Sequence, residues 1–285
     1  MVSESEVKSK TLVLGRGFVG KEFERYGFTV KDRSYVNVDE IIEGTYSKVF
    51  IEELLDGKYD NIVNCIGISD TRYCEDRNNW LKVQTINGDF VRHLSNLCKF
   101  YGKKFVHIST GCLYENTQGL KYENGKTETH CNYTVSKMIG ELHCNKDDLI
   151  LRPRLLFNKY KDPKNLLYKL EKFNKFLNEF NTVCSTEEIV NSTIELLKRN
   201  LNGVYNIGNT GTYTISQLAD AFRQPEWYEV MDQHELICSQ KLHLVNNVMS
   251  LDKLIDDTGY IPKDAFKEIR MIADKGGLQD YDSDK

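Results

Sequence analysis

Near its N-terminus the chain reads TLVLGRGFVG, residues 11–20, and its fold is best predicted outward from that stretch. An apolar run ends at Gly15, the spacing G-x-G-x-x-G continues through Gly17 and Gly20, and residues 21–26 have a helical pattern. In such a turn the first glycine permits the tight bend, and the second lets backbone N–H groups approach a pyrophosphate. The third allows close packing of helix on strand, and the helix N-terminus favours the anion. The stretch therefore predicts a dinucleotide-binding turn, with an ordinary tight turn as the alternative.

A second apolar run, residues 28–30, ends at Asp32 and Arg33, where such folds contact the adenosine ribose. An acidic residue at this point binds the 2′-hydroxyl of the ribose, whereas an arginine accommodates a 2′-phosphate. Because Asp32 and Arg33 together offer both kinds of side chain, the choice of cofactor stays open. The arginine favours NADPH over NADH. Either residue could equally be a charge on a solvated loop.

Strands and helices alternate through most of the chain. The residue patterns predict further strands at residues 28–30, 62–67, 104–110, 149–153 and 203–207, and helices at residues 38–55, 80–101, 133–144 and 186–200. The helix at residues 80–101 is expected to be continuous, with an apolar stripe from Leu81 to Leu97. Residues 110–133 show little regular patterning. The alternation with short connections is typical of a doubly wound, mostly parallel, Rossmann-like α/β sheet.

The pattern changes after Leu151, and this change suggests how the domain is organised. Residues 1–151 are predicted to form the dinucleotide-binding domain, completed by about residues 180–207. Residues 152–179 and 208–273 are predicted to form a small substrate-binding lobe over the carboxyl edge of the sheet, where ligands bind in such folds. Residues 274–285 are expected to be a flexible tail.

Composition and charge exclude several classes of protein. The 38 Lys and Arg residues nearly balance the 42 Asp and Glu residues, so nothing attracts nucleic acid or an anionic membrane in general. No apolar run approaches the ~20 residues needed to cross a bilayer, and residues 1–10 contain no apolar signal-peptide core. The eight cysteines contain no C-x-x-C pair, so we expect reduced thiols and no metal site. A soluble cytoplasmic protein is the resulting expectation.

Tyr133 and Lys137 form a Tyr-x-x-x-Lys pattern within the helix predicted at residues 133–144. Residues four apart share one face of a helix, so both side chains should point the same way. A nearby ammonium favours the phenolate and lowers the pKa of tyrosine from its usual ~10, so Tyr133 could serve as an acid–base group. With 16 tyrosines in a lysine-rich chain, such a pair also arises by chance, and a solvated helix face is the alternative.

Several motifs occur in the order found in extended short-chain dehydrogenases/reductases. They are the glycine turn, NCIG at residues 64–67, STG at 109–111 and the Tyr133–Lys137 pair. Within that group the chain resembles the 4-dehydrorhamnose reductase branch, and most of all the nucleotide-4-keto-6-deoxy-glucose 3,5-epimerase/4-reductases of nucleotide-rhamnose synthesis. Longer stretches that resemble this branch are STGCLYE at 109–115, LRPR at 151–154, DPKNLLYK at 162–169 and KRNLNGVYN at 198–206. The glycine turn is one residue tighter than the G-x-x-G-x-x-G of extended members.

The resemblance implies a two-part reaction on a nucleotide-4-keto-6-deoxy-glucose. In the reduction, Tyr133 supplies a proton to the 4-oxygen, Thr110 hydrogen-bonds the same oxygen, and Lys137 holds the cofactor ribose. In the epimerisation, Cys112 and Lys169 act as base and proton donor on opposite faces of the sugar. The alternatives are a turn-capping hydroxyl for Thr110, a packing residue for Cys112 and a surface charge for Lys169.

The complete set of expected contacts follows from the same resemblance. The cofactor-binding residues would be Gly15, Gly17, Phe18, Val19, Gly20, Asp32, Arg33, Cys65, Ile66, Gly67 and Lys137. A UDP sugar is favoured over a dTDP sugar, a homodimer is expected, and a separate 4,6-dehydratase would be the partner. Two rival functions remain open: a 4-reductase in which Cys112 and Lys169 are incidental, and a non-catalytic regulatory subunit that binds a dinucleotide.

Overall fold

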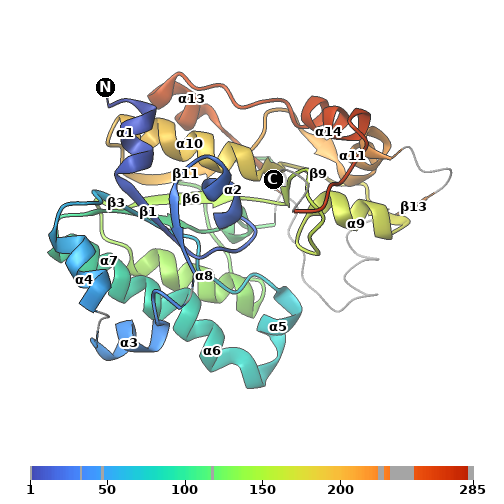
Figure 1. Cartoon of the computed structure of the whole chain (residues 1–285). Coiled ribbons are helices and arrows are strands. Elements are labelled where there is room, and N and C mark those ends of the chain that lie inside the picture. The colour runs from blue at the N-terminus through green and yellow to red at the C-terminus, as the bar shows by residue number, and fades with distance from the viewer. Residues whose placement is uncertain are drawn as a thin grey trace.

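The computed structural model describes residues 2–32, 34–45, 48–116, 119–223, 228–231 and 247–281. At its centre lies a six-stranded sheet in the order β11-β6-β4-β3-β1-β2, in which every neighbouring pair is parallel (Figure 1). Its strands are β1 (Thr11–Leu14), β2 (Thr29–Lys31), β3 (Asn61–Asn64), β4 (Lys104–Ile108), β6 (Leu149–Pro153) and β11 (Gly203–Ile207). The predicted doubly wound, parallel α/β fold is therefore confirmed.

Helices cover both faces of the sheet, because side chains alternate between the faces along each buried strand. Val13 and Val63 face one apolar core, and Leu12 and Ile62 face the other. The helices on the first side are α1 (Glu4–Ser9), α2 (Gly20–Arg25), α10 (Thr186–Lys198) and α13 (Asp252–Thr258). Those on the second side are α3 (Val38–Glu43), α4 (Lys48–Leu55), α7 (Phe90–Phe100) and α8 (Asn132–His143) (Figure 1). Residues 38–55 thus form two helices, where the sequence predicts one helical stretch.

The helix predicted at residues 80–101 is continuous but irregular. It divides into α6 (Trp80–Gln84), a π-helical turn η2 (Thr85–Asp89) and α7. Leu81, which was expected in the apolar stripe, is 76% exposed. A Cβ on Gly140 of α8 would stand 2.3 Å from the carbonyl oxygen of Asn87, so the π-helical turn and α8 approach very closely. Turns of this kind are frequent at functional sites.

A lobe with its own apolar core lies beside the sheet. Its main elements are α9 (Leu166–Lys172), β8 (Lys175–Leu177), α11 (Ile215–Phe222), β13 (Glu229–Met231) and α14 (Ala265–Asp274). Leu218 and Ile269 are fully buried in this core. Residues 252–258 were assigned to the lobe, but they form α13, which packs on the sheet. Leu254 of α13 joins the core under α10, and Lys253 donates to a carbonyl of β11.

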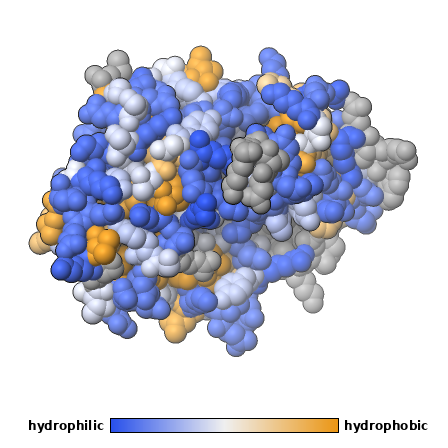
Figure 2. Space-filling view, in the orientation of Figure 1, coloured by the Kyte–Doolittle hydropathy of each residue, from blue (hydrophilic) through white to orange (hydrophobic). Residues whose placement is uncertain are grey.

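Short strand pairs extend the structure outside the central sheet. They are β5 (Leu120–Lys121) with β14 (Val248–Met249), β7 (Leu156–Phe157) with β10 (Cys184–Ser185), and β9 (Phe180–Asn181) with β12 (Tyr213–Thr214). Residues 110–133 contain β5 and a 3-10 turn η3 (Gly111–Leu113), although the sequence shows little regular patterning there. Among the described helices, none has both the length and the apolar character needed to span a bilayer. The face in Figure 2 is mostly hydrophilic, with apolar side chains in small separate groups.

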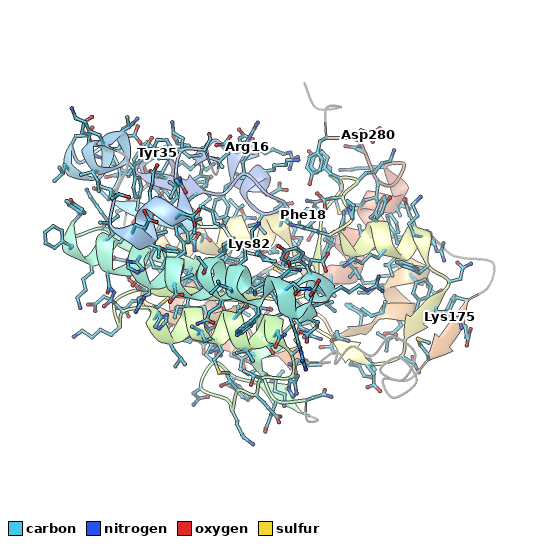
Figure 3. All side chains as sticks on the ribbon, turned by 90° about the horizontal axis from the view of Figure 1, so that it is seen from below. Arg16, Phe18, Tyr35, Lys82, Lys175 and Asp280 are labelled. Atoms are coloured by element: carbon cyan, nitrogen blue, oxygen red, sulfur yellow. The ribbon has the colours of Figure 1, made fainter. Side chains whose placement is uncertain are left out.

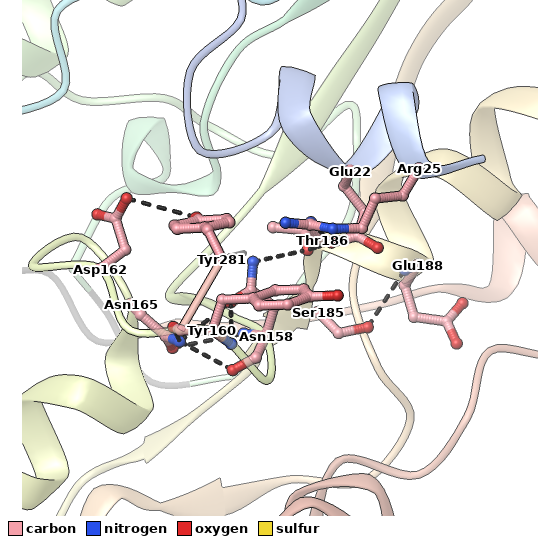
Figure 4. Close-up of polar contacts among 10 residues, drawn as sticks. All are labelled: Glu22, Arg25, Asn158, Tyr160, Asp162, Asn165, Ser185, Thr186, Glu188 and Tyr281. Carbon is pink, nitrogen blue, oxygen red and sulfur yellow. Dashed lines mark hydrogen bonds and ion pairs between the residues drawn. The ribbon is translucent and has the colours of Figure 1, made fainter. Parts of the chain in front are cut away.

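The segment after α14 is packed, whereas the sequence suggests a flexible tail from residue 274. Tyr281 stacks on Tyr160 with ring centroids 5.0 Å apart, and the guanidinium of Arg25 lies 3.6 Å from the Tyr160 centroid (Figure 4). The backbone of Gln279 also exchanges hydrogen bonds with the segment around Tyr160. Residues 275–281 therefore hold α2, the helix that follows the glycine turn, against the lobe. Residues 282–285 lie outside the described part.

Candidate active site

The glycine-rich turn between β1 and α2 is as tight as its motif requires. Gly15 has a φ of +103°, in the left-handed region that favours glycine, and a Cβ there would lie 2.9 Å from the backbone of Cys65. A Cβ on Gly20 would stand 1.8 Å from the carbonyl oxygen of Gly15. Around Gly17, apart from its chain neighbours, no described heavy atom lies within 4 Å of a built Cβ. The backbone is therefore approachable at the middle glycine and crowded at the other two.

The other residues of the turn point in different directions. Phe18 is only 7% exposed and Val19 packs against a sheet core, so these two side chains support the turn from inside. Arg16 projects outward and pairs with Glu24 of α2, with Nε 2.9 Å from the carboxylate oxygen (Figure 3). The turn thus presents its backbone and one cation to solvent.

The ends of β1 and β2 meet where a ribose is expected. Asp32 accepts hydrogen bonds from the backbone N–H and the hydroxyl of Ser34, at 2.9 and 2.6 Å, and these bonds lower the pKa of its carboxyl. Arg33 lies outside the described residues. Arg16 instead brings a cation within electrostatic reach of Asp32. The sequence analysis missed Arg16, although an arginine between two motif glycines was a visible signal.

The turn after β3 connects the glycine turn to α8. The Ile66 side chain touches Gly15, and burial raises the pKa of the Cys65 thiol to about 12, so that this thiol is neutral. A Cβ on Gly67 would lie 3.3 Å from Oδ1 of Asn87 and 4.0 Å from Nζ of Lys137. The structure therefore places the predicted residues at positions 65–67 between the glycine turn and Lys137.

Lys137 is held at the strand ends by its ammonium group. Its side chain is 5% exposed, and Nζ donates to the carbonyl oxygen of Ile108 at 2.7 Å and lies 3.4 Å from Nε2 of His107. Burial lowers the pKa of Lys137 from 10.5 to about 8, against an opposing effect of Glu141. Burial, and then Lys137, hold the pKa of His107 well below its usual value, so the imidazole is neutral. Lys137 can therefore change protonation state near neutral pH.

Tyr133 lies one turn before Lys137 on α8. Burial raises the pKa of its phenol, Cys112 raises it further, and a hydrogen bond with Thr110 opposes the rise. The net shift is therefore opposite to the lowered pKa that the sequence predicts, because the loss of water around the phenolate is the largest effect. A phenol that keeps its proton at neutral pH is suited to donate one.

Thr110 caps a turn and also faces Tyr133. Its Oγ1 accepts a hydrogen bond from the backbone N–H of Cys112 at 3.2 Å, at the start of η3, and the side chain is 5% exposed. The same side chain hydrogen-bonds Tyr133. The turn-capping alternative and the predicted position beside Tyr133 are thus both realised.

Cys112 faces a buried guanidinium. Its Sγ lies 3.3 Å from Nη1 of Arg154, whose side chain is 4% exposed. Nε and Nη2 of Arg154 donate to Oδ1 of Asn181 at 3.2 and 2.8 Å. Arg154 belongs to the LRPR stretch but was given no site role. Cys112 and Arg154 are 42 residues apart along the chain, so their positions in the sequence do not indicate that they are in contact.

Asn87 is a second residue that the sequence analysis missed. It lies in the π-helical turn, where Oδ1 accepts from the backbone N–H of Ile68 at 2.8 Å. Its Nδ2 donates to the carbonyl of Ile68 and to the hydroxyl of Ser136 on α8, both at 2.9 Å. Asn87 thereby joins the segment after β3 to the helix that carries Tyr133. An asparagine within an apolar stripe was the available signal.

Lys169 lies apart from this group, exposed on α9 of the lobe. Partial burial of its ammonium lowers its pKa, and Asp70 and Asp162 act in the opposite direction. Asp70 caps α5 (Thr71–Glu75), which packs on α8. Lys169 therefore faces the side of α5 and α8, and its described electrostatic partners are carboxylates rather than Cys112.

The structure thus brings Thr110, Cys112, Tyr133 and Lys137 together where β4 ends and α8 begins. Within the described ranges, no three His, Cys, Asp or Glu side chains are grouped as a metal ion would require.

Solved structures share this fold. A UDP-rhamnose synthase from Acanthamoeba polyphaga mimivirus superimposes with a TM-score of 0.77 at 20% identity, over 93% of this chain and 99% of that one. A dTDP-4-dehydrorhamnose reductase from Bacillus anthracis, solved in complex with NADP, gives a TM-score of 0.75 at 16% identity, over 94% and 100%. At these identities the likeness shows the fold alone.

Curated relatives come from Arabidopsis thaliana. A bifunctional dTDP-4-dehydrorhamnose 3,5-epimerase/dTDP-4-dehydrorhamnose reductase is 26% identical over 227 residues, covering 73% of this chain and 70% of the relative. A trifunctional UDP-glucose 4,6-dehydratase/UDP-4-keto-6-deoxy-D-glucose 3,5-epimerase/UDP-4-keto-L-rhamnose-reductase is 25% identical over 227 residues, covering 72% of this chain. The match spans only 33% of that trifunctional relative. The family model described as RmlD substrate binding domain matches residues 9–235, and the chain therefore belongs to this family.

Proposed function

We propose that this chain is an NADPH-dependent enzyme that reduces C4 of a nucleotide-4-keto-6-deoxy-glucose and epimerises C3 and C5, giving a nucleotide-L-rhamnose. The observation that carries the proposal is the cluster of Thr110, Tyr133 and Lys137 beside the glycine turn. The activities named for the Arabidopsis relatives support the substrate class. A UDP sugar is favoured, since the trifunctional relative and the viral structure are both named for UDP sugars.

The glycine turn fits a dinucleotide, because its backbone is open at Gly17 and a side chain on Gly15 or Gly20 would collide with neighbouring backbone. The residues that would hold the dinucleotide are Gly15, Gly17, Phe18, Val19 and Gly20 for the pyrophosphate, Asp32, Arg33 and Arg16 for the adenosine ribose, and Cys65, Ile66, Gly67 and Lys137 toward the nicotinamide. NADPH is favoured over NADH because Arg16 and Arg33 offer positive charge to a 2′-phosphate. When bound, the cofactor supplies the hydride.

The chain's own residues would handle the proton of the reduction. Tyr133 keeps its proton because burial raises its pKa, and it would donate that proton to the 4-oxygen as negative charge develops there. Thr110 would hydrogen-bond the same oxygen. Lys137, fixed by the carbonyl of Ile108, would bind the ribose hydroxyls and add positive charge to the site.

The epimerisation would use the acidity of the carbons beside the 4-keto group. Cys112 would remove a proton from C3 or C5, since the C–H electrons can delocalise onto the 4-oxygen as an enolate. Lys169 would return a proton from the lobe, and the lowering of its pKa by partial burial makes it a stronger acid. A 4,6-dehydratase, an activity named for the trifunctional relative, would supply the substrate.

Two other functions stay as alternatives. A 4-reductase would leave Cys112 and Lys169 without a chemical role, and a regulatory subunit would bind the dinucleotide without turnover. The cation beside Cys112 favours the bifunctional enzyme over the first. The half-buried Tyr133, hydrogen-bonded to Thr110, favours an enzyme over the second. A homodimer stays a prediction.

The test is turnover of UDP- and dTDP-4-keto-6-deoxy-glucose with NADPH in deuterated water. We expect a nucleotide-rhamnose with deuterium at C3 and C5, because both reprotonations draw on exchangeable groups. Cys112→Ala and Lys169→Ala should block deuterium entry, and cofactor binding should remain. Product without deuterium from the wild type would leave a reductase only, and no product from either sugar would contradict the proposal.

A further inference from the structure

Arg154 is a buried cation that has no carboxylate partner among the described residues. Its side chain is 4% exposed, and its hydrogen bonds go to the neutral amide oxygen of Asn181 and to the sulfur of Cys112. In the part of the chain that the structure describes, no carboxylate lies within ion-pair distance of Arg154. A guanidinium does not lose its proton in proteins, so the positive charge of Arg154 must be balanced by a neighbouring anionic group.

Arg152, two residues earlier on the same stretch, shows the usual arrangement. It is also buried, and it forms an ion pair with Glu141 in which Nε lies 2.9 Å from a carboxylate oxygen. Leaving a buried charge unpaired is strongly unfavourable, so buried guanidinium groups generally have an anionic partner. The guanidinium of Arg152 contacts the carboxylate of Glu141, whereas that of Arg154 contacts the sulfur of Cys112.

Cys112 is held in position to be that partner. Its backbone N–H donates to Oγ1 of Thr110 at 3.2 Å, and the preceding Gly111 packs closely against the Met249 side chain. Asn181 is 1% exposed and fixes the guanidinium from the other side. The guanidinium that lies 3.3 Å from Sγ of Cys112 is therefore held in place by a second partner.

We propose that Arg154 is a positioning residue that keeps Cys112 in the thiolate form, so that Cys112 can act as the base of the epimerisation. A cation this close favours the thiolate, and the thiolate in turn supplies the anion that Arg154 lacks. In the step itself the C–H bond breaks, an S–H bond forms, and the electron pair moves onto the 4-oxygen. Only this proton transfer rests on the proposed function. The ionisation of Cys112 requires no substrate and can be measured on the protein alone.

The test is the pH dependence of alkylation of the folded wild-type chain by iodoacetamide, read by mass spectrometry. Trypsin separates the two thiols next to Tyr133, with Cys112 in residues 105–121 and Cys131 in residues 127–137. Each rate is divided by its own plateau at high pH, which removes differences in accessibility. Because only the thiolate reacts, we expect the normalised rate of Cys112 at pH 7 to exceed that of Cys131 at least about 10-fold. Burial raises the pKa of Cys131, which makes it the internal control.

Variants then assign the effect to the guanidinium. Arg154→Gln should lower the normalised rate of Cys112 at pH 7 by about 10-fold or more, and Arg154→Lys should restore part of it, since a cation remains. Arg152→Gln removes the neighbouring buried cation and should leave the pH profile of Cys112 unchanged. Unfolding would speed the alkylation of buried thiols such as Cys98, the opposite of the expected slowing, so a poorly folded variant is recognised.

Two results would overturn the inference. The first is a wild-type Cys112 that needs the same pH as Cys131 to react, and the second is an Arg154→Gln profile identical to that of the wild type. Deuterium exchange at C3 and C5 is measured separately. A reactive Cys112 that depends on Arg154, in an enzyme that exchanges neither proton, would support the pairing and contradict the epimerase function.

Discussion

Replacing Lys137 by methionine should remove a residue of the proposed site and also remove a pH-dependent loss of stability near neutral pH. The reason is that Lys137 is 5% exposed and its pKa falls from 10.5 to about 8 on folding. A lysine with a depressed folded pKa contributes stability above its unfolded pKa, and that stability is lost as pH falls through the folded pKa. At pH 7 the wild type therefore carries the full cost of a buried ammonium.

The size of the effect follows from the same two values. One pKa unit corresponds to about 1.4 kcal/mol, and between about pH 9.5 and about pH 8 only the unfolded chain holds the proton. The free energy of unfolding of the wild type, relative to Lys137→Met, should therefore be about 2 kcal/mol lower at pH 7 than at pH 9.5. The hydrogen bond to Ile108 is lost at every pH, so it cancels in this comparison.

Urea denaturation of both proteins at the two pH values measures this difference, because other groups titrate alike in both. Lys82→Met, which removes an exposed lysine of α6, is the control, and its effect should not change between the two pH values (Figure 3). A stability difference between wild type and Lys137→Met that is the same at both pH values would refute the reasoning. It would mean that water reaches the ammonium.

Three further predictions concern other residues of the site. Tyr133→Phe should retain NADPH binding in fluorescence titration but lose reduction by about 10²-fold or more in a spectrophotometric assay, and unchanged turnover would exclude a proton-donating role. Arg16→Gln should raise the KM for NADPH several-fold and leave that for NADH unchanged, and equal changes for both would exclude contact with a 2′-phosphate. Asn87→Ala removes three hydrogen bonds of a buried side chain and should lower the free energy of unfolding by about 2–3 kcal/mol in urea, whereas a loss under about 0.5 kcal/mol would show that the junction with α8 does not depend on it.

Features set by short stretches could be predicted from the sequence. Gly20 is crowded by the carbonyl of Gly15, five residues earlier, so the motif spacing predicted the tight turn. The crowding of Gly15 by Cys65 and Ile66 comes from a distant segment, which the motif does not reveal. Helix α8 begins and ends within one residue of the predicted 133–144, because its side-chain pattern has the helical period. The parallel sheet followed from the alternation of strands and helices.

Features set by contacts between distant segments could not be predicted. The π-helical turn at Asn87 depends on the absence of a side chain at Gly140, and the apolar stripe of the helix shows no sign of it. The packed tail depends on Tyr281 meeting Tyr160, and the site depends on Arg154 meeting Cys112. The direction of the Tyr133 pKa shift needed the balance between burial and charge, which only the folded structure supplies.

Hydride transfer to C4 of the sugar is the central claim, and labelled cofactor tests it most directly. NADPH carrying deuterium at both C4 positions of the nicotinamide is incubated in ordinary water with UDP-4-keto-6-deoxy-glucose and the protein, and the sugar product is examined by NMR. We expect one deuterium at C4 of the product sugar, with protium at C3 and C5. Unchanged substrate and unconsumed NADPH, or a reduced sugar that carries no deuterium at C4, would contradict it.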